Sequence, residues 1–293
     1  MMIISLVWFL VILGLSCLLV GLAVYVYCLS TYTTKPYHCE VVREESFKIP
    51  IETEKETIEL DAKILKSIYT PTDAPCVIVC HGWMSDLRAL RYLQEPLTLQ
   101  GYTVVAYSSR GHGKSGGRRE FPAIYEDIIK VIDYLQEQNQ FGIDPNRIAV
   151  VGHSMGASIA LNHAYLDERV KVVVGISAMH NVKESFERKK KIFSLPFWAK
   201  VWLKLTRLQT KLTDEENHYA SPRFYLEQPS NTEVVLIHAK NDPLVEFDNF
   251  QKNVELLNLP EDHFLIFDKG GHSFFHQEGM ILSQVIKWLN KYL

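Results

Sequence analysis

The chain has 293 residues, with 31 Lys and Arg against 34 Asp and Glu, and its formal net charge at pH 7 is −3. This near-neutral balance excludes a nucleic-acid-binding protein that depends on a strongly basic surface. A content of 47% hydrophobic and 11% aromatic residues excludes a disordered chain and is sufficient for the core of one large domain.

The N-terminal segment, residues 3–29, is an almost unbroken apolar run, and no charged residue precedes Lys35. About 20 apolar residues cross a bilayer as a helix, so the run predicts one transmembrane helix. The alternative is a cleaved signal peptide, but no basic residue precedes the run and it exceeds the usual ~7–15 apolar residues. Residues 30–44 are expected to form a polar linker. Because basic residues follow the helix and none precedes it, the positive-inside rule predicts a cytoplasmic domain after a single pass.

Residues 45–293 alternate between apolar runs and helical patterns, which predicts an α/β fold with a mainly parallel sheet. The apolar runs are continuous, as in strands buried on both faces. The predicted strands are Cys76–Cys80, Val104–Tyr107, Ile148–Val151, Val172–Ile176, Val234–Ile237 and Phe264–Phe267. The predicted helices are Leu87–Leu99, Ile124–Gln138, Ala157–Leu166, Asp248–Leu257 and Met280–Leu293. Residues 46–68 have no helical pattern and predict antiparallel edge strands.

A candidate nucleophile lies in Gly152-His153-Ser154-Met155-Gly156, directly after the third predicted strand and before a predicted helix. This is Gly-x-Ser-x-Gly in the strand–turn–helix context of a nucleophile elbow, where a tight turn exposes the serine hydroxyl. The simpler alternative is a tight turn with a serine that caps the helix. The context favours Ser154 as a nucleophile.

An acid and a histidine follow in the chain. A serine hydroxyl is a weak nucleophile without a base, and elbow enzymes carry their partners in the order serine, acid, histidine. Asp242 follows the fifth predicted strand and His272 follows the sixth. Ligands bind at the carboxyl ends of parallel strands, so the three side chains are expected at one edge of the sheet. Asp242 would orient His272, which would deprotonate Ser154. Glu246 and His276 are the alternative acid and base.

An oxyanion hole needs two backbone N–H donors. One is expected from Met155, directly after the candidate nucleophile. The other is expected from Trp83, in the loop His81-Gly82-Trp83 that follows the first predicted strand. His-Gly by itself is also compatible with an ordinary turn.

No metal or cofactor is predicted. The sequence contains neither His-Glu-x-x-His nor paired Cys-x-x-Cys motifs. Gly113-Lys114-Ser115 lacks the earlier glycine of a phosphate-binding loop, because Ser108 stands at that position. Nucleotide binding is therefore not expected.

Taken together, these motifs resemble the α/β-hydrolase superfamily and are similar to its monoacylglycerol-lipase and serine-aminopeptidase-like branch. The matching segments are His81-Gly82-Trp83, Arg110–Ser115, Asp144–Gly156, Asn241–Val245 and Gly271-His272. The resemblance implies a triad of Ser154, Asp242 and His272. It also implies that Trp83 and Met155 supply the oxyanion donors.

The resemblance covers the chain from about residue 45 to the end. It departs from many relatives at Ala157, where a second glycine often follows the elbow. It also departs at Ser109, where an aspartate often precedes the Arg-Gly-His-Gly loop and helps to anchor it. A transmembrane segment is not a general feature of the family.

A lid insertion is implied at about residues 180–228, between the fourth and fifth predicted strands. Within it, Lys183–Lys211 contains nine basic and two acidic residues, a charge of +7. Apolar residues from Trp198 to Leu212 recur at helical spacing with basic residues between them. This pattern is typical of a helix that lies on a membrane surface. The alternative is a lid helix that packs its apolar stripe on the protein's own core.

The sequence therefore predicts a membrane-anchored serine hydrolase that cleaves carboxylic esters, lipid-like or acylated, through an acyl-enzyme. An acyltransferase, or an amidase or aminopeptidase, with the same triad is the alternative. A non-catalytic scaffold is a further one, since fold does not imply function. The expected partners are a small-molecule or lipid ester and the membrane, with no nucleic acid.

Overall fold

The computed structural model describes residues 14, 16, 17, 21, 39–138, 141–185, 187 and 212–293. The chain divides into two compact units, Met1–Glu40 and Val41–Leu293. Among the described residues, no helix has both the length and the apolar character needed to cross a bilayer. The predicted transmembrane segment 3–29 lies outside the described residues except at four positions, and the basic segment 188–211 lies outside them entirely.

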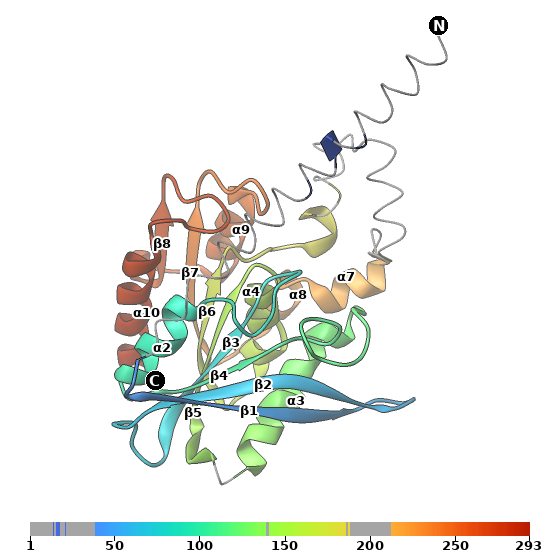
Figure 1. Ribbon diagram of the computed structural model, residues 1–293. Helices are drawn as coiled ribbons and strands as arrows, with labels where there is room; N and C mark the ends of the chain where they lie inside the picture. The colour runs from blue at the N-terminus through green and yellow to red at the C-terminus, as the bar shows by residue number, and fades with distance from the viewer. Residues whose placement is uncertain are drawn as a thin grey trace, which may run out of the picture. The chain divides into compact units, whose positions relative to one another are not determined.

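An eight-stranded sheet lies at the centre of the described part of the second unit (Figure 1). Its strands are β1 (Val42–Glu52), β2 (Thr57–Ser67), β3 (Ala74–Cys80), β4 (Thr103–Tyr107), β5 (Ile143–His153), β6 (Val170–Ile176), β7 (Glu233–Ala239) and β8 (Phe264–Phe267). They are ordered β1-β2-β4-β3-β5-β6-β7-β8. All pairs from β4 to β8 are parallel, whereas β1 pairs with β2, and β2 with β4, antiparallel. The predicted α/β fold and its six parallel strands are confirmed.

The antiparallel edge is present, but it begins earlier than predicted. Its first strand starts at Val42, so the predicted linker 30–44 and the domain start at residue 45 placed this boundary three residues late. The first residues of β1 are mostly polar, so no apolar pattern indicated a strand there. As the edge strand, β1 has one exposed face, and of its eleven residues only Val42, Ile49 and Ile51 are buried. An antiparallel strand can leave one face in solvent, and polar residues are then expected on that face.

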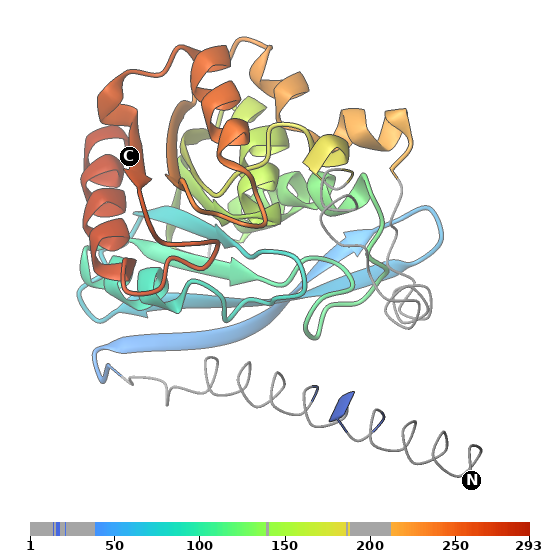
Figure 2. The ribbon, with the colours of Figure 1, turned by 90° about the horizontal axis from the view of Figure 1, so that it is seen from above.

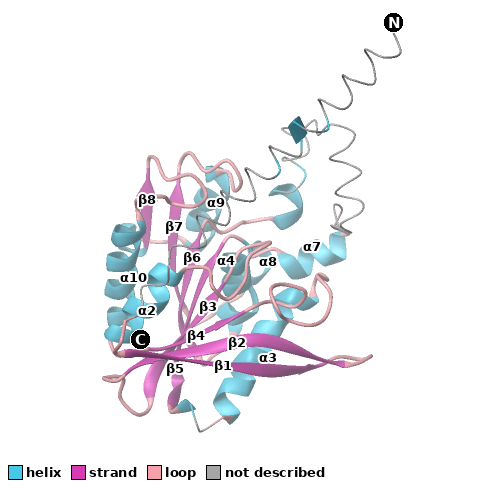
Figure 3. Ribbon diagram, viewed as in Figure 1, coloured by secondary structure: helices cyan, strands magenta, loops and turns pink. Residues whose placement is uncertain are grey.

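Helices alternate with the strands and cover both faces of the sheet (Figures 2 and 3). They are α2 (Arg91–Leu99), α3 (Ala123–Glu137), α4 (Met155–Ile159), the π-helical turn η2 (Ala160–Ala164), α7 (Asp214–Ala220), α8 (Arg223–Leu226), α9 (Phe247–Leu257), the 3₁₀ turn η3 (Glu261–His263) and α10 (Glu278–Tyr292). Each helix predicted from the sequence is present, with α2 starting at Arg91. On α3, apolar residues at helical spacing, among them Tyr125, Ile128 and Ile132, are buried, whereas Ile129 is half-buried. Burial of such stripes against the sheet holds the strand ends in place.

Candidate active site

Ser154 lies in a sharp turn between β5 and α4, with φ 56° and ψ −114°. A non-glycine residue at such a φ is strained. Close contacts require glycine on both sides. A Cβ atom at Gly152 would lie 2.0 Å from the Gly156 carbonyl oxygen, and one at Gly156 would lie 2.1 Å from that of Cys80. The Ser154 side chain makes no capping hydrogen bond to α4, so the alternative of a helix cap is not observed.

Asp242 and His272 are directly hydrogen-bonded, with 2.8 Å between Asp242 Oδ2 and His272 Nδ1. Asp242 lies in the turn after β7, where the backbone N–H groups of Leu244 and Val245 donate to its Oδ1 at 2.8 and 2.9 Å. The Ser177 hydroxyl donates to Oδ2 at 2.7 Å. The carboxyl is fully buried, and the His272 side chain is 15% exposed. The structure thus brings the predicted acid and the predicted base together.

These contacts determine the charge of the acid. Burial by itself would raise the pKa of Asp242. The hydrogen bond and charge of His272, with the bonds from Val245 and Ser177, outweigh burial and lower that pKa to about 2. The carboxylate is therefore ionised near neutral pH and accepts a hydrogen bond from the N–H group at His272 Nδ1. This leaves His272 Nε2 free to accept a proton.

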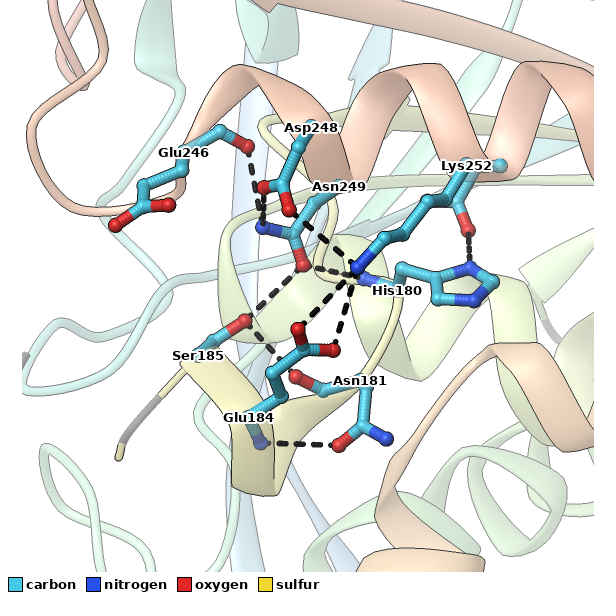
Figure 4. A network of polar contacts seen from close by, with 9 residues as sticks. His180, Asn181, Glu184, Ser185, Glu246, Asp248, Asn249 and Lys252 are labelled. Carbon is cyan, nitrogen blue, oxygen red and sulfur yellow. Dashed lines mark hydrogen bonds and ion pairs between the residues drawn. The ribbon is translucent and has the colours of Figure 1, made fainter. Parts of the chain in front are cut away.

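The alternative acid, Glu246, lies elsewhere. It is the N-cap residue of α9, and its carbonyl oxygen accepts the Asn249 side-chain amide at 3.1 Å. Figure 4 shows Glu246 at the border of a polar network that ties the first residues of the insertion to α9. In that network, Asn249 Oδ1 accepts hydrogen bonds from His180 N–H and the Ser185 hydroxyl. Asp242, rather than Glu246, occupies the position beside His272.

The alternative base, His276, is exposed and follows His272 in the same loop. That loop is held from two sides. Asn241 Oδ1 accepts the backbone N–H groups of Gly270 and Gly271 at 3.0 and 2.9 Å. His153 Nε2 donates to the His272 carbonyl oxygen at 2.8 Å. His153 directly precedes Ser154, so this bond links the serine turn to the histidine loop.

The expected oxyanion loop lies against the serine. A Cβ atom at Gly82 would lie 3.4 Å from Ser154 Cβ, so the two turns are in contact. The Trp83 ring stacks on Phe121 with 5.8 Å between centroids. Among the described residues, neither the Trp83 nor the Met155 N–H donates a backbone hydrogen bond. Within the described part of the chain, no backbone acceptor thus competes for the two N–H groups that the sequence predicts as oxyanion donors.

The loop after β4 is anchored although Ser109 replaces the usual aspartate. Arg110 forms a buried, two-pronged ion pair with Asp127 of α3, with Nε 2.7 Å from Oδ2. The Ser109 N–H donates to His81 Nε2 at 2.9 Å. Arg110 and His81 thus attach this loop to α3 and to the loop after β3.

Three residues at the site were not found from the sequence. His153 occupies the variable position of Gly-x-Ser-x-Gly, where the motif assigns no role. Asn241 directly precedes the predicted acid, and its short polar side chain in a loop was the available signal. Ser177 follows β6 directly, and its position at a strand's carboxyl end was the only indication.

A family model described as serine aminopeptidase, S33, matches residues 72–223. Among curated proteins, the chain is similar to the uncharacterized protein YqkD of Bacillus subtilis, with 36% identity over 123 residues. It is also similar to epoxide hydrolase B of Mycobacterium tuberculosis, with 33% identity over 109 residues. These matches cover 37% and 35% of this chain, and 39% and 28% of the two relatives. The chain thus spans at most about two fifths of these two proteins.

Solved structures are similar over most of the chain. The esterase Pf2001 of Pyrococcus furiosus has a TM-score of 0.66 and 23% identity, over 85% of this chain and 93% of that one. The acylaminoacyl peptidase of Pyrococcus horikoshii has a TM-score of 0.65 and 19% identity, over 86% of this chain and 42% of that one. At these identities the likeness establishes the fold.

Proposed function

Because the chain belongs to the serine aminopeptidase S33 family of α/β-hydrolases, we propose that it is a serine hydrolase that cleaves carboxylic esters. Ser154 is the nucleophile, His272 the general base and Asp242 the acid that orients the base. The observation that carries this proposal is the buried hydrogen bond between Asp242 and His272, at the strand edge where Ser154 is held in a strained turn.

In this mechanism, His272 Nε2 takes the Ser154 proton as Oγ attacks the ester carbonyl. The N–H groups of Trp83 and Met155 stabilise the oxyanion, and each such donor contributes about 10²–10³ in rate. The imidazolium then protonates the leaving alcohol, and water activated by His272 releases the acid from the acyl-enzyme. The ionised Asp242 stabilises the imidazolium throughout.

Apolar side chains around the site favour a lipid-like or acylated substrate. Met84, Leu244 and Phe275 are 59%, 40% and 52% exposed. Each lies within three residues of Trp83, Asp242 or His272, so the loops that carry these three residues also carry exposed apolar side chains. Such surface is typical of a place that binds an apolar partner. The names of the similar structures, an esterase and an acylaminoacyl peptidase, are compatible with ester or amide cleavage.

Membrane anchoring is part of the proposal. Residues 3–29 supply more than the ~20 apolar residues needed for a helix that crosses a bilayer. The basic residues after this segment favour a cytoplasmic hydrolase domain. The support for both statements is the sequence pattern.

The test is covalent labelling of the full chain in detergent with a fluorophosphonate, followed by a series of p-nitrophenyl esters of rising acyl length. Ser154→Ala should abolish labelling and lower kcat by about 10⁴–10⁶. Adding an acceptor alcohol distinguishes an acyltransferase, which would form a new ester in place of the free acid. Labelling that persists in Ser154→Ala would move the nucleophile elsewhere.

A further inference from the structure

Ser177 has a backbone conformation that its residue type disfavours. It follows β6 directly, is fully buried and has φ 51°. Its N–H donates to the Ile237 carbonyl oxygen at 2.8 Å, so the strand ladder holds this conformation in place. Glycine adopts such a φ without strain, whereas serine does not. A strained non-glycine residue directly after a buried strand indicates a role for its side chain.

The Ser177 side chain contacts the carboxylate of Asp242. The Ser177 hydroxyl donates to Asp242 Oδ2 at 2.7 Å, and the same oxygen accepts His272 Nδ1 at 2.8 Å. The other oxygen accepts two backbone N–H groups, from Leu244 and Val245. Each carboxylate oxygen thus receives two hydrogen bonds, which fixes the plane of the carboxyl group. Without the hydroxyl, Oδ2 would keep only the bond from His272.

We propose that Ser177 is a positioning residue of the hydrolytic site, whose hydroxyl holds Asp242 Oδ2 toward His272. The strained backbone is the cost of carrying that hydroxyl where glycine would fit best. The inference rests on the proposed function, because Ser177 acts on the reaction only through the Asp242–His272 pair.

Loss of the hydroxyl has a defined electrostatic consequence. A carboxylate with one donor fewer is more basic and stabilises a neighbouring imidazolium more strongly. The acid limb of the pH–rate profile, where the general base becomes protonated, should therefore move to higher pH. The other titratable groups that face the pair are His153 from β5 and His238 from β7. Burial lowers the pKa of both, that of His153 to about 4, so both are neutral near pH 7.

The experiment compares Ser177→Gly and Ser177→Ala with the full-length wild type in detergent, using p-nitrophenyl ester hydrolysis. Both variants delete the hydroxyl, but only glycine also relieves the backbone strain. The control is Thr232→Val. It removes another buried hydroxyl, which donates to the Val170 carbonyl oxygen at 2.9 Å, near the opposite ends of the strands.

Both Ser177 variants should lower kcat about 10- to 100-fold, as loss of a supporting hydrogen bond around an active group typically does. KM should stay unchanged, and the acid limb should shift upward. Ser177→Gly should melt no lower than Ser177→Ala, because it removes the strain. Thr232→Val should lose stability but keep the wild-type pH profile. Wild-type kcat in Ser177→Gly, or an unmoved acid limb in both Ser177 variants, would overturn the inference.

The experiment distinguishes failure of the proposed hydrolase function from failure of the role proposed for Ser177. If the wild type is neither labelled by fluorophosphonate nor active on esters, the proposed function fails. The inference is then decided by the NMR signal of the His272 Nδ1 proton. Ser177→Gly should shift that signal, since its hydrogen-bond acceptor becomes more basic. An unchanged signal would contradict the positioning role.

Discussion

His153 donates a hydrogen bond from Nε2 to the backbone carbonyl oxygen of His272 at 2.8 Å, and their ring centroids lie 4.6 Å apart. The bond joins the end of β5 to the loop after β8, between residues that are 119 apart in the chain. Burial, and next the neighbouring His272, lower the pKa of His153 to about 4. The ring is therefore neutral near pH 7, and its single proton lies on Nε2, because a carbonyl can only accept.

Replacing His153 tests whether this hydrogen bond holds the loop that carries His272 in position. His153→Phe keeps a flat ring but loses the donor, so the His272 carbonyl loses its partner. We expect kcat on a short soluble ester to fall about 10- to 100-fold with little change in KM. His153→Gln, which keeps an N–H donor, should retain more activity. Equal activity in the two variants would mean that ring packing, rather than the hydrogen bond, positions His272.

The choice of acid is tested by Asp242→Asn beside Glu246→Gln. An amide in place of Asp242 favours the wrong tautomer of His272, and in a comparable triad this costs about 10⁴ in kcat. Glu246→Gln should cost far less, because Glu246 begins α9 and Asp242 contacts His272. Steady-state hydrolysis of one p-nitrophenyl ester measures both. The reverse ranking would assign the acid to Glu246.

Asp242 should also make stability depend on pH. Its pKa is lowered to about 2 in the folded chain, from ~3.9 in an unfolded one. This contribution to the free energy of unfolding is therefore fully present above pH ~3.9 and is lost as pH falls toward 2. It amounts to about 2–3 kcal/mol. Urea unfolding of wild type and Asp242→Asn, followed by tryptophan fluorescence, measures it. The difference in free energy of unfolding should shrink between pH 4 and pH 2. A constant difference across that range would disprove the linkage.

The buried pair of Arg110 and Asp127 should be essential for stability. Their side chains are 8% and 0% exposed, so Asp127→Asn would leave a buried guanidinium without its counter-charge. Breaking such a pair typically costs about 3–5 kcal/mol. Asp268→Asn is the control, because it removes an exposed ion pair with Lys240 and should change little. Urea unfolding at pH 7 compares them, and equal effects would contradict a structural role for the buried pair.

The sheet could be predicted because its strands are continuous apolar runs. Val172–Ile176 is fully buried, as a strand covered on both faces must be. The start of β1 was missed for the opposite reason. Its residues Arg43, Glu44 and Glu45 face solvent at the edge of the sheet, so no apolar pattern marks them.

Some residues of the candidate site could likewise be predicted from the sequence, and others could not. Ser154, Asp242 and His272 were proposed because strand-end position and residue order suffice to identify such candidates. His153 and Ser177 could not be found, since their roles come from contacts between segments that are far apart in the chain. Ser177 in particular depends on its φ and on its distance to Asp242 Oδ2, and neither quantity is encoded in a local pattern.

The basic segment Lys183–Lys211 should bind to anionic membranes. Its residues 188–211 lie outside the described part of the chain. A charge of +7 should draw this segment to anionic lipid, since each Lys or Arg near such a surface contributes about 1 kcal/mol. The attraction is screened within ~8 Å at physiological salt, so added salt should weaken it. A shortened chain beginning at about residue 40 omits the proposed membrane anchor, residues 3–29, and retains the compact unit Val41–Leu293.

Binding of this shortened chain to vesicles should rise with the anionic lipid fraction and fall with salt, as measured by cosedimentation. The test variant replaces four basic residues of the segment with glutamine: Lys200, Lys204, Arg207 and Lys211. The matched control makes the same change of charge at four exposed lysines of the described domain: Lys55, Lys130, Lys240 and Lys287. Only the first variant should lose binding, and both should hydrolyse a short soluble ester, because neither alters the site. Equal loss in both would mean that overall charge is responsible. Binding indifferent to lipid charge would instead favour a lid helix that packs on the protein itself.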